Sequence, residues 1–324
     1  MAIAFTDILA ARQRIAGRVL KTPMRRSQAL ERLAGAPVWL KCEHHQTTGS
    51  FKLRGATNAV LSLSDEERSR GVVTFSTGNH GRALSHAAIA AGTRAVVCMS
   101  ALVPQNKVEA IRALGADVRI VGRSQDEAER AAGELEKAEG MTRVSPMDDA
   151  AVIAGQGTLG IEVMENAPDL DVVLVPLSGG GLIAGVALAV KTLSPKTRVV
   201  GVGSKSCPAM AASLEAGHPV EVPEEPSLAD SLGGGIGLGN RHTFEMAKRY
   251  VDECVLVGED DIAAGIRFAY EAEGEMIEGA AAVGIAALLN GAVKSAGPTA
   301  IILTGRNIAP DLHRRVINGE TPEI

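Results

Sequence analysis

The chain has 324 residues, of which 46% are hydrophobic and 22% are charged, and its formal net charge is −5. This composition predicts a globular protein with one large or two modest cores. The acidic balance and the 2% aromatic content argue against nucleic acid as a partner, because phosphate binding needs clustered Lys and Arg and base stacking needs aromatic side chains. The cysteines form no CxxC pair and no zinc spacing, so we expect a reducing compartment: Cys42, Cys98, Cys207 and Cys254.

Charged residues interrupt the apolar N-terminal segment over residues 5–15, which excludes a signal peptide or a membrane-spanning helix there. We expect a helix capped by Thr6 or Asp7 instead. Its apolar residues on or near one face are Ile8, Leu9, Ile15 and Leu20. The chain is therefore expected to be cytoplasmic, with no membrane partner.

Short apolar runs alternate with helical patterns along the rest of the chain. The expected strands are residues 38–40, 72–75, 95–99, 118–121, 172–175, 199–202, 254–257 and 300–303. Helices are expected between them, including residues 82–91, 106–114 and 124–139. Continuous apolar runs are typical of strands buried on both faces of a parallel sheet, so the pattern predicts an α/β fold. Residues 72–146 are expected to form a small domain, and residues 1–71 with 147–324 a large one.

Ligands of parallel sheets bind where strands end and helices begin, and the first such loop contains Lys52. Ser50 is the expected N-cap of a helix, which places Lys52 in the first turn. The helix dipole disfavours a cation in a first turn and lowers the pKa of an amine, which suits a neutral nucleophile. A solvated lysine would give the same sequence pattern.

The second loop, Ser76-Thr77-Gly78-Asn79-His80-Gly81, follows the strand at residues 72–75. Its small residues would let backbone N–H groups approach a carboxylate. Asn79 can donate a hydrogen bond to a phenolate-type oxygen, and His80 could orient a substrate. Gly-Asn is also an ordinary turn, so a structural interpretation stays open.

The third loop, Ser178-Gly179-Gly180-Gly181-Leu182, joins a strand to a helix. Consecutive glycines expose N–H groups and tolerate positive φ, which favours a phosphate nest. The spacing matches neither a Walker A loop nor GxGxxG, so several phosphorylated cofactors fit. The fourth loop, Thr304-Gly305-Arg306-Asn307, places the Thr304 hydroxyl at the end of a strand.

A reactive lysine, an anion loop, a phosphate nest and a hydroxyl group are together what pyridoxal phosphate requires. The sequence resembles the fold type II pyridoxal-phosphate enzymes (tryptophan synthase β-like) of the threonine dehydratase and serine racemase family. The matching segments are residues 48–56, 76–81, 152–158 and 178–182. The resemblance implies two open, parallel-type sheet domains with the cofactor between them.

The resemblance also implies a role for each matching residue. Lys52 would hold the cofactor covalently and act as the acid–base group, and Phe51 would lie beside the cofactor ring. Asn79 would bond the 3-hydroxyl oxygen, and Thr304 would meet the pyridine nitrogen. The phosphate would be bound by Ser178, Gly179, Gly180, Gly181 and Leu182. The substrate α-carboxylate would be bound by Ser76, Thr77, Asn79 and His80.

The implied reaction is β-elimination from a β-hydroxy amino acid, which gives a 2-oxo acid and ammonia. A racemase on the same scaffold and a non-catalytic ligand-binding protein are the alternatives. Racemase-like relatives carry serine where this chain has Thr77, which makes efficient racemisation doubtful. We expect a homodimer, as is common in the family.

Further features of the sequence concern metal binding, the chemistry of the substrate and the branch of the family that the chain resembles. Residues 203–209 lack the carboxylates that hold a divalent cation in some relatives, so no metal is predicted. Arg306 either pairs with a second anionic group on the substrate or faces solvent. Glu278 matches a family glutamate near the cofactor, and could equally be a helix-capping acid. Residues 227–237 and 304–307 resemble the hydroxyectoine-utilisation dehydratase branch.

Overall fold

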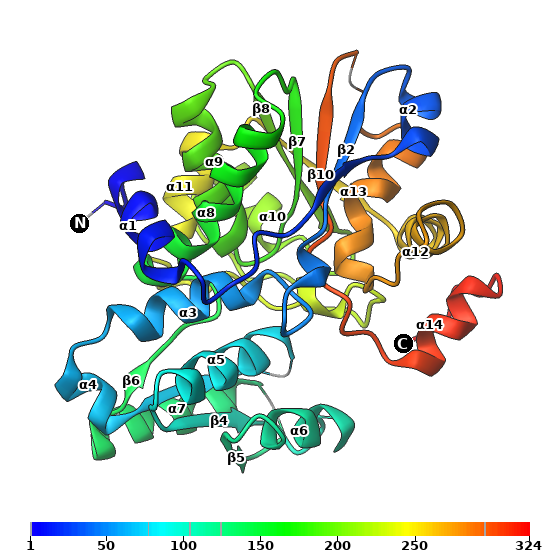
Figure 1. Ribbon diagram of the computed structural model, residues 1–324. Helices are drawn as coiled ribbons and strands as arrows, with labels where there is room; N and C mark the ends of the chain where they lie inside the picture. The colour runs from blue at the N-terminus through cyan, green and yellow to red at the C-terminus, as the bar shows by residue number, and fades with distance from the viewer. Residues whose placement is uncertain (1, 77, 104, 124, 295) are drawn as a thin grey trace.

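The computed structural model describes residues 2–76, 78–103, 105–123, 125–294 and 296–324, and contains two sheets (Figure 1). The larger sheet has the strand order β1-β2-β10-β7-β8-β9. Its strands are β1 (Met24–Arg26), β2 (Val38–Lys41), β7 (Val172–Pro176), β8 (Arg198–Ser204), β9 (Glu253–Val257) and β10 (Thr299–Ile302). The smaller sheet has the order β5-β4-β3-β6. Its strands are β3 (Val72–Phe75), β4 (Ala95–Met99), β5 (Asp117–Ile120) and β6 (Thr142–Arg143).

All the recorded strand pairs are parallel except β1 with β2, which confirms the α/β class expected from the apolar runs. Each of the eight expected strands is present. Strands β1 and β6 were not predicted, because they are only three and two residues long and contain no apolar run. The proposed division at residues 72–146 stays a prediction.

Helices cover both faces of the larger sheet, and the cores lie between these layers. Neighbouring strand residues point to opposite faces, so Val173 packs in the cluster with Val186, whereas Leu174 packs in the cluster with Ile285. The helices along the chain are α1 (Phe5–Ile15), α2 (Gln28–Ala34), α3 (Lys52–Ser62), α4 (Asp65–Arg70), α5 (Asn79–Ala90), α6 (Gln105–Arg112), α7 (Gln125–Glu139), α8 (Ala150–Asn166), α9 (Gly181–Leu193), α10 (Ala209–Ala216), α11 (Thr243–Tyr250), α12 (Glu259–Glu273), α13 (Gly279–Leu289) and α14 (Pro310–Ile317). The described residues also form two 3₁₀ helices, η1 (Glu43–His45) and η2 (Asp230–Leu232).

Helix α1 is present, but the predicted cap was wrong. Its N-cap is Ala4, and Asp7 lies in the first turn, where its carboxylate accepts a hydrogen bond from the Ala4 N–H. The predicted apolar face was also too broad, since Leu9 and Leu20 are 40% and 50% exposed. No helix in the described ranges has the length and apolar character needed to span a membrane.

Helix α3 lies between the two sheets, where it contacts α8 and α5 (Figure 1). Its first residue is Lys52, so the lysine stands at the boundary between the halves of the molecule. This position brings the lysine close to loops from both sheets.

Candidate active site

A buried ion-pair network fixes the start of α3. The Arg54 guanidinium donates to both carboxylate oxygens of Glu43, at 2.8 Å each, and to those of Glu162, at 2.7 and 2.8 Å. Lys41 Nζ adds an ion pair of 2.6 Å to Glu162. Paired forks of this kind hold a guanidinium rigidly, so Lys52, two residues before Arg54, is held in place with the helix.

The Lys52 amine is mostly enclosed by protein. Its Nζ donates a 2.7 Å hydrogen bond to the Pro146 carbonyl and lies 5.3 Å from the centroid of the Phe51 ring. Burial lowers the pKa of Lys52 to about 8, against an opposing attraction from Glu278. A substantial part of this amine is therefore neutral near physiological pH.

Ser50 is not the helix cap that the local pattern predicted. The N-cap of α3 is Phe51, without a side-chain cap, and Ser50 pairs with Gly305 in an isolated antiparallel β-bridge. The Phe51 N–H donates to the Thr304 carbonyl at 3.0 Å. The bridge to Gly305 replaces the expected Ser50 cap. It places Thr304, which is 3% exposed, beside the start of α3.

Asn79 is the centre of a hydrogen-bond network at the start of α5. Its Nδ2 donates to Glu278 Oε1 at 2.7 Å, and its Oδ1 accepts from Asn307 Nδ2 at 2.5 Å. An amide nitrogen has two N–H groups, and among the described residues only Glu278 accepts from Asn79 Nδ2, so its second N–H can serve a ligand.

Glu278 faces this network and does not cap its helix. It occupies the N-cap position of α13 without a side-chain cap bond, and its Oε2 accepts from the Asn307 N–H at 3.0 Å. Burial, with a contribution from Asp230, raises the pKa of Glu278 to about 7. Glu278 thus has the N-cap position that the capping interpretation predicted, but its carboxylate accepts hydrogen bonds from Asn79 and Asn307 and none from the described N–H groups of its own helix.

The loop after β3 is arranged around Ser76. The Ser76 Oγ accepts hydrogen bonds from the N–H groups of Gly78 at 3.3 Å and Gly81 at 3.1 Å. His80 is buried, and its Nε2 lies 3.2 Å from the Val144 carbonyl. Burial and the nearby Lys52 lower the pKa of His80 to about 3, so its ring is neutral. Thr77 lies outside the described residues.

The glycine loop opens α9 and has no room for side chains. Gly180 is the N-cap of α9 with φ of 90°, a value that favours glycine. A Cβ at Gly179 would overlap the Met147 sulfur, and one at Gly181 would lie 2.6 Å from the Met147 carbonyl oxygen. Ser178 Oγ donates a 3.4 Å bond to the Gly233 carbonyl, and Leu182 is buried. Bare backbone N–H groups at a helix N-terminus fit a phosphate.

The roles of several site residues could not be predicted from the sequence, because they depend on contacts that only the fold creates. Pro146 and Met147 contribute backbone or packing contacts, and Asn307, the last residue of the fourth loop, bonds Asn79 from 228 positions away. Arg306, the cation singled out from the sequence, has an exposed residue position, and its backbone N–H donates to the Gly49 carbonyl at 2.9 Å. A different cation, Arg82, lies next to Asn307.

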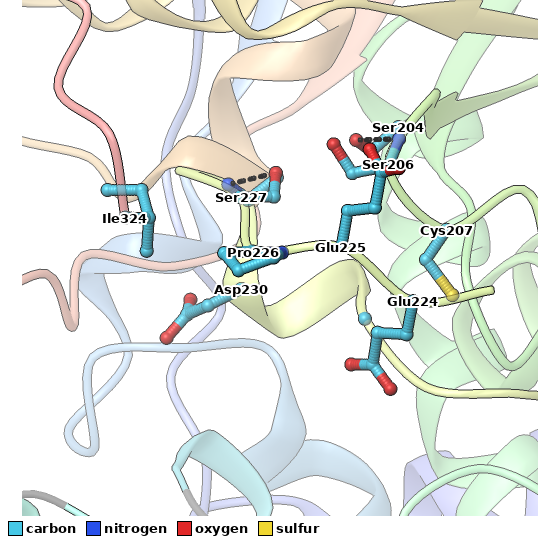
Figure 2. A pocket seen from close by; sticks show the side chains of 11 residues that line it. Ser204, Ser206, Cys207, Glu224, Glu225, Pro226, Ser227, Asp230 and Ile324 are labelled. Atoms are coloured by element: carbon cyan, nitrogen blue, oxygen red, sulfur yellow. Dashed lines mark hydrogen bonds between the residues drawn. The ribbon is translucent and has the colours of Figure 1, made fainter.

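The sequence predicts no bound metal, and this stays a prediction. Two groups of side chains in the structure contain atoms that could act as metal ligands. From the segment at residues 203–209, Ser204, Ser206 and Cys207 line a cavity of about 330 Å³. A different segment contributes carboxylates to the same cavity: Glu224, Glu225 and Asp230 (Figure 2). Elsewhere, candidate ligand atoms from three residues come within 4.8 Å of one another: Cys42, His44 and His45. Both imidazoles of that second cluster already contact Glu275 Oε2, at 2.8 and 3.0 Å.

Comparison with known proteins places this site in a family. Residues 15–305 match the model for the family described as pyridoxal-phosphate dependent enzyme. A Sinorhizobium fredii protein that bears a threonine dehydratase name is 56% identical over 98% of this chain and 96% of that protein. The L-threonine ammonia-lyase of Thermotoga maritima is 42% identical over 98% of this chain and 78% of its own. Maize serine racemase superposes with a TM-score of 0.92 at 31% identity, and each chain is covered to 98%.

The chain therefore belongs to the pyridoxal-phosphate dependent enzyme family. The resemblance to the fold type II threonine dehydratase and serine racemase group is confirmed, and with it the cofactor. Within the family, the chain is an ammonia-lyase-type enzyme similar to threonine dehydratase.

Proposed function

We propose that the enzyme eliminates the β-hydroxyl group of a β-hydroxy amino acid and releases a 2-oxo acid and ammonia. The observation that carries this proposal is the Lys52 amine, whose pKa is lowered to about 8 and which lies at the boundary between the two sheets. A partly neutral amine can both hold an aldehyde cofactor and take up a proton. The lyase names of the relatives support the same reaction.

The remaining groups would hold the cofactor. Pyridoxal phosphate, when bound, supplies an electron sink for the bond that breaks at the substrate Cα. The phosphate would be bound by the N–H groups of residues 178–182 and by the dipole of α9. The free N–H of Asn79 would donate to the 3-oxygen of the cofactor, because its partner N–H is already held by Glu278. Thr304 would present an uncharged hydroxyl to the pyridine nitrogen, with Phe51 beside the ring.

The loop after β3 would take the substrate α-carboxylate. Ser76 Oγ already accepts two N–H groups, so its own O–H is free to donate to a carboxylate. His80 would act through its backbone N–H, since its neutral ring donates from Nε2 to the Val144 carbonyl. Thr77 is proposed to add a hydroxyl to the same anion.

The elimination balances in atoms and charge. Lys52 Nζ would remove the Cα proton, and the β C–O bond would break with its electron pair moving onto oxygen, which leaves as water after protonation. The released enamine takes up a water molecule and loses ammonia. The net change converts one amino acid into one 2-oxo acid and one ammonia, with no oxidant or reductant.

The direct experiment measures the products formed from L-serine and L-threonine by the purified holoenzyme. We expect 2-oxo acid and ammonia in equal amounts, and loss of both in Lys52→Ala. Dominant formation of the D-amino acid would favour the racemase alternative, which the fold of maize serine racemase makes the main competitor. A colourless protein that forms neither product would favour a ligand-binding role.

The finer proposal assigns the enzyme to hydroxyectoine utilisation, on the resemblance of residues 227–237 and 304–307 to that branch. A hydroxyectoine-derived hydroxy amino acid should then be turned over faster than L-serine, and the reverse order would reject this assignment. We also propose a cytoplasmic homodimer, as in the family. Light scattering of the holoenzyme would give twice the chain mass, whereas a single chain mass would contradict it.

A further inference from the structure

The first turn of α5 carries a cation, Arg82, next to the proposed cofactor site. Arg82 and Asn79 are three residues apart and therefore lie on neighbouring positions of the same helix face. Arg82 Nη1 donates a 3.1 Å hydrogen bond to Asn307 Oδ1, and Asn307 Nδ2 donates to Asn79 Oδ1. A single side chain thus separates this guanidinium from Asn79.

The surroundings of Arg82 disfavour its charge. The residue is half-buried, and this burial lowers the pKa of the guanidinium, with only a partial opposing effect of Glu278. The positive end of the α5 dipole adds a second unfavourable term. Within the described ranges, no carboxylate oxygen forms an ion pair with Arg82, and Asn307 Oδ1 is the acceptor recorded for its five N–H groups. An anion supplied by a ligand would remove this imbalance.

We propose that Arg82 binds a second carboxylate on the substrate, so that the enzyme acts on β-hydroxy amino acids with an acidic side chain, of the 3-hydroxyaspartate type. This inference rests on the proposed elimination reaction. The α-carboxylate would lie at the start of α5, beside Ser76, and Arg82 lies further along the same helix, with its guanidinium on Asn307. A guanidinium fork and a carboxylate form two parallel hydrogen bonds, which gives both affinity and orientation.

The elimination from such a substrate has the same balance as before. Lys52 would take the Cα proton, the β-hydroxyl would leave as water, and hydrolysis would release ammonia and a four-carbon 2-oxo dicarboxylate. The second carboxylate takes no part in bond breaking. Arg82 is therefore a specificity-determining residue, and Arg306, with its exposed position, is not required for it.

A structural role is the competing explanation, because Arg82 also positions Asn307, which in turn bonds Asn79. The two roles differ in how substrates respond. Loss of a purely positioning contact would slow the turnover of every substrate equally, whereas loss of a carboxylate subsite would slow the turnover of the acidic substrate most.

The test compares wild-type holoenzyme with Arg82→Gln and Arg82→Lys, and uses Arg306→Gln as a control that removes the same charge from an exposed position. Each stereoisomer of 3-hydroxyaspartate is assayed against L-serine and L-threonine. We expect the wild type to prefer one acidic isomer, and Arg82→Gln to lower its kcat/KM by about 10- to 100-fold, which corresponds to loss of a charged hydrogen bond. The kcat/KM for L-serine should fall far less than that for the acidic isomer, Arg82→Lys should lie between, and Arg306→Gln should match the wild type.

A second readout does not need turnover. L-Aspartate lacks the leaving hydroxyl, so its binding to the holoenzyme is followed by the change in cofactor absorbance, with L-alanine as the reference. Arg82→Gln should weaken L-aspartate binding far more than L-alanine binding.

The outcomes separate the two proposals. Elimination from L-serine or L-threonine without preference for an acidic substrate, or an equal loss on all substrates in Arg82→Gln, would overturn the subsite and leave the reaction standing. Failure of every substrate to yield a 2-oxo acid would overturn the reaction. L-Aspartate binding would then still decide the role of Arg82, because equal affinity in the wild type and Arg82→Gln would reject it.

Discussion

The low pKa of Lys52 should control the pH at which the apo-enzyme takes up its cofactor. Only the neutral amine attacks an aldehyde. With a pKa of about 8, about a quarter of the amine is neutral at pH 7.5, whereas an ordinary lysine, with a pKa of 10.5, is neutral in about one molecule in a thousand. Covalent attachment at pH 7.5 should therefore be about 200-fold faster than for an unperturbed lysine of equal intrinsic reactivity.

Glu278 should shift the pH dependence of cofactor attachment, since its negative charge raises the pKa of Lys52. Glu278→Gln removes the charge and should shift the Lys52 titration to lower pH. Ser231→Ala is the matched control, because it removes a 3.3 Å hydrogen bond to Glu278 Oε1 but leaves the carboxylate in place.

The assay follows the visible absorbance that develops after pyridoxal phosphate is added to cofactor-free enzyme across the pH range. The wild type and Ser231→Ala should show a midpoint near pH 8, and Glu278→Gln a lower one. A rate that continues to rise towards pH 10 without a break would refute the assigned pKa. An unchanged midpoint in Glu278→Gln would refute the coupling between the two groups.

Three other substitutions test the supports of the site. Gly179→Ala places a methyl group on the Met147 sulfur, so we expect weaker cofactor binding, measured by equilibrium dialysis of pyridoxal phosphate. Ser76→Ala removes the acceptor for two N–H groups at the start of α5 and should raise KM by about 10-fold, with little change in cofactor affinity. Arg54→Met leaves the Glu43 charge buried and should lower the free energy of unfolding by about 3–5 kcal/mol, measured by denaturant titration. Because the pKa of Glu43 is lowered in the fold, its stabilising effect is present above about pH 4.5 and is lost as the pH falls further.

Two of these substitutions, Gly179→Ala and Arg54→Met, have a matched control. Gly133→Ala lies in α7 with open space around its Cβ, so it should leave cofactor binding unchanged. Arg314→Ala breaks an exposed pair with Asp311 and should alter the free energy of unfolding by about 0.5 kcal/mol or less. Equal effects of Gly179→Ala and Gly133→Ala on the cofactor would argue against a phosphate nest. An Arg54→Met protein as stable as Arg314→Ala would contradict the buried network.

Local sequence patterns predicted those parts of the molecule that are set by apolar runs. The strand at residues 72–75 is buried along its whole length, and its sequence, Val-Val-Thr-Phe, is a mainly apolar run. Strand β6, with the sequence Thr142-Arg143, exists because β3 offers backbone partners, and no pattern in its own residues indicates this. Ser50 illustrates the opposite error, since a favourable local cap was replaced by a β-bridge to Gly305.

The residues of the candidate site likewise fall into those that local motifs predict and those that only the fold brings together. Lys52 and the glycine loop follow from short motifs whose backbone chemistry is local. The network of Asn79 with Glu278 and Asn307 joins residues about 200 positions apart, so its bonds appear only in the fold. The position of Arg82 beside Asn307 likewise depends on how the two sheets pack.

The central claim is that the Lys52 amine carries the cofactor while the glycine loop holds its phosphate. Borohydride reduction of the purified holoenzyme, followed by proteolysis and mass spectrometry, tests this claim directly. We predict that the pyridoxyl-phosphate mass is found on the peptide that contains Lys52 and is absent from Lys52→Ala. Labelling of another lysine in the wild-type protein, or labelling that persists in Lys52→Ala, would contradict the account.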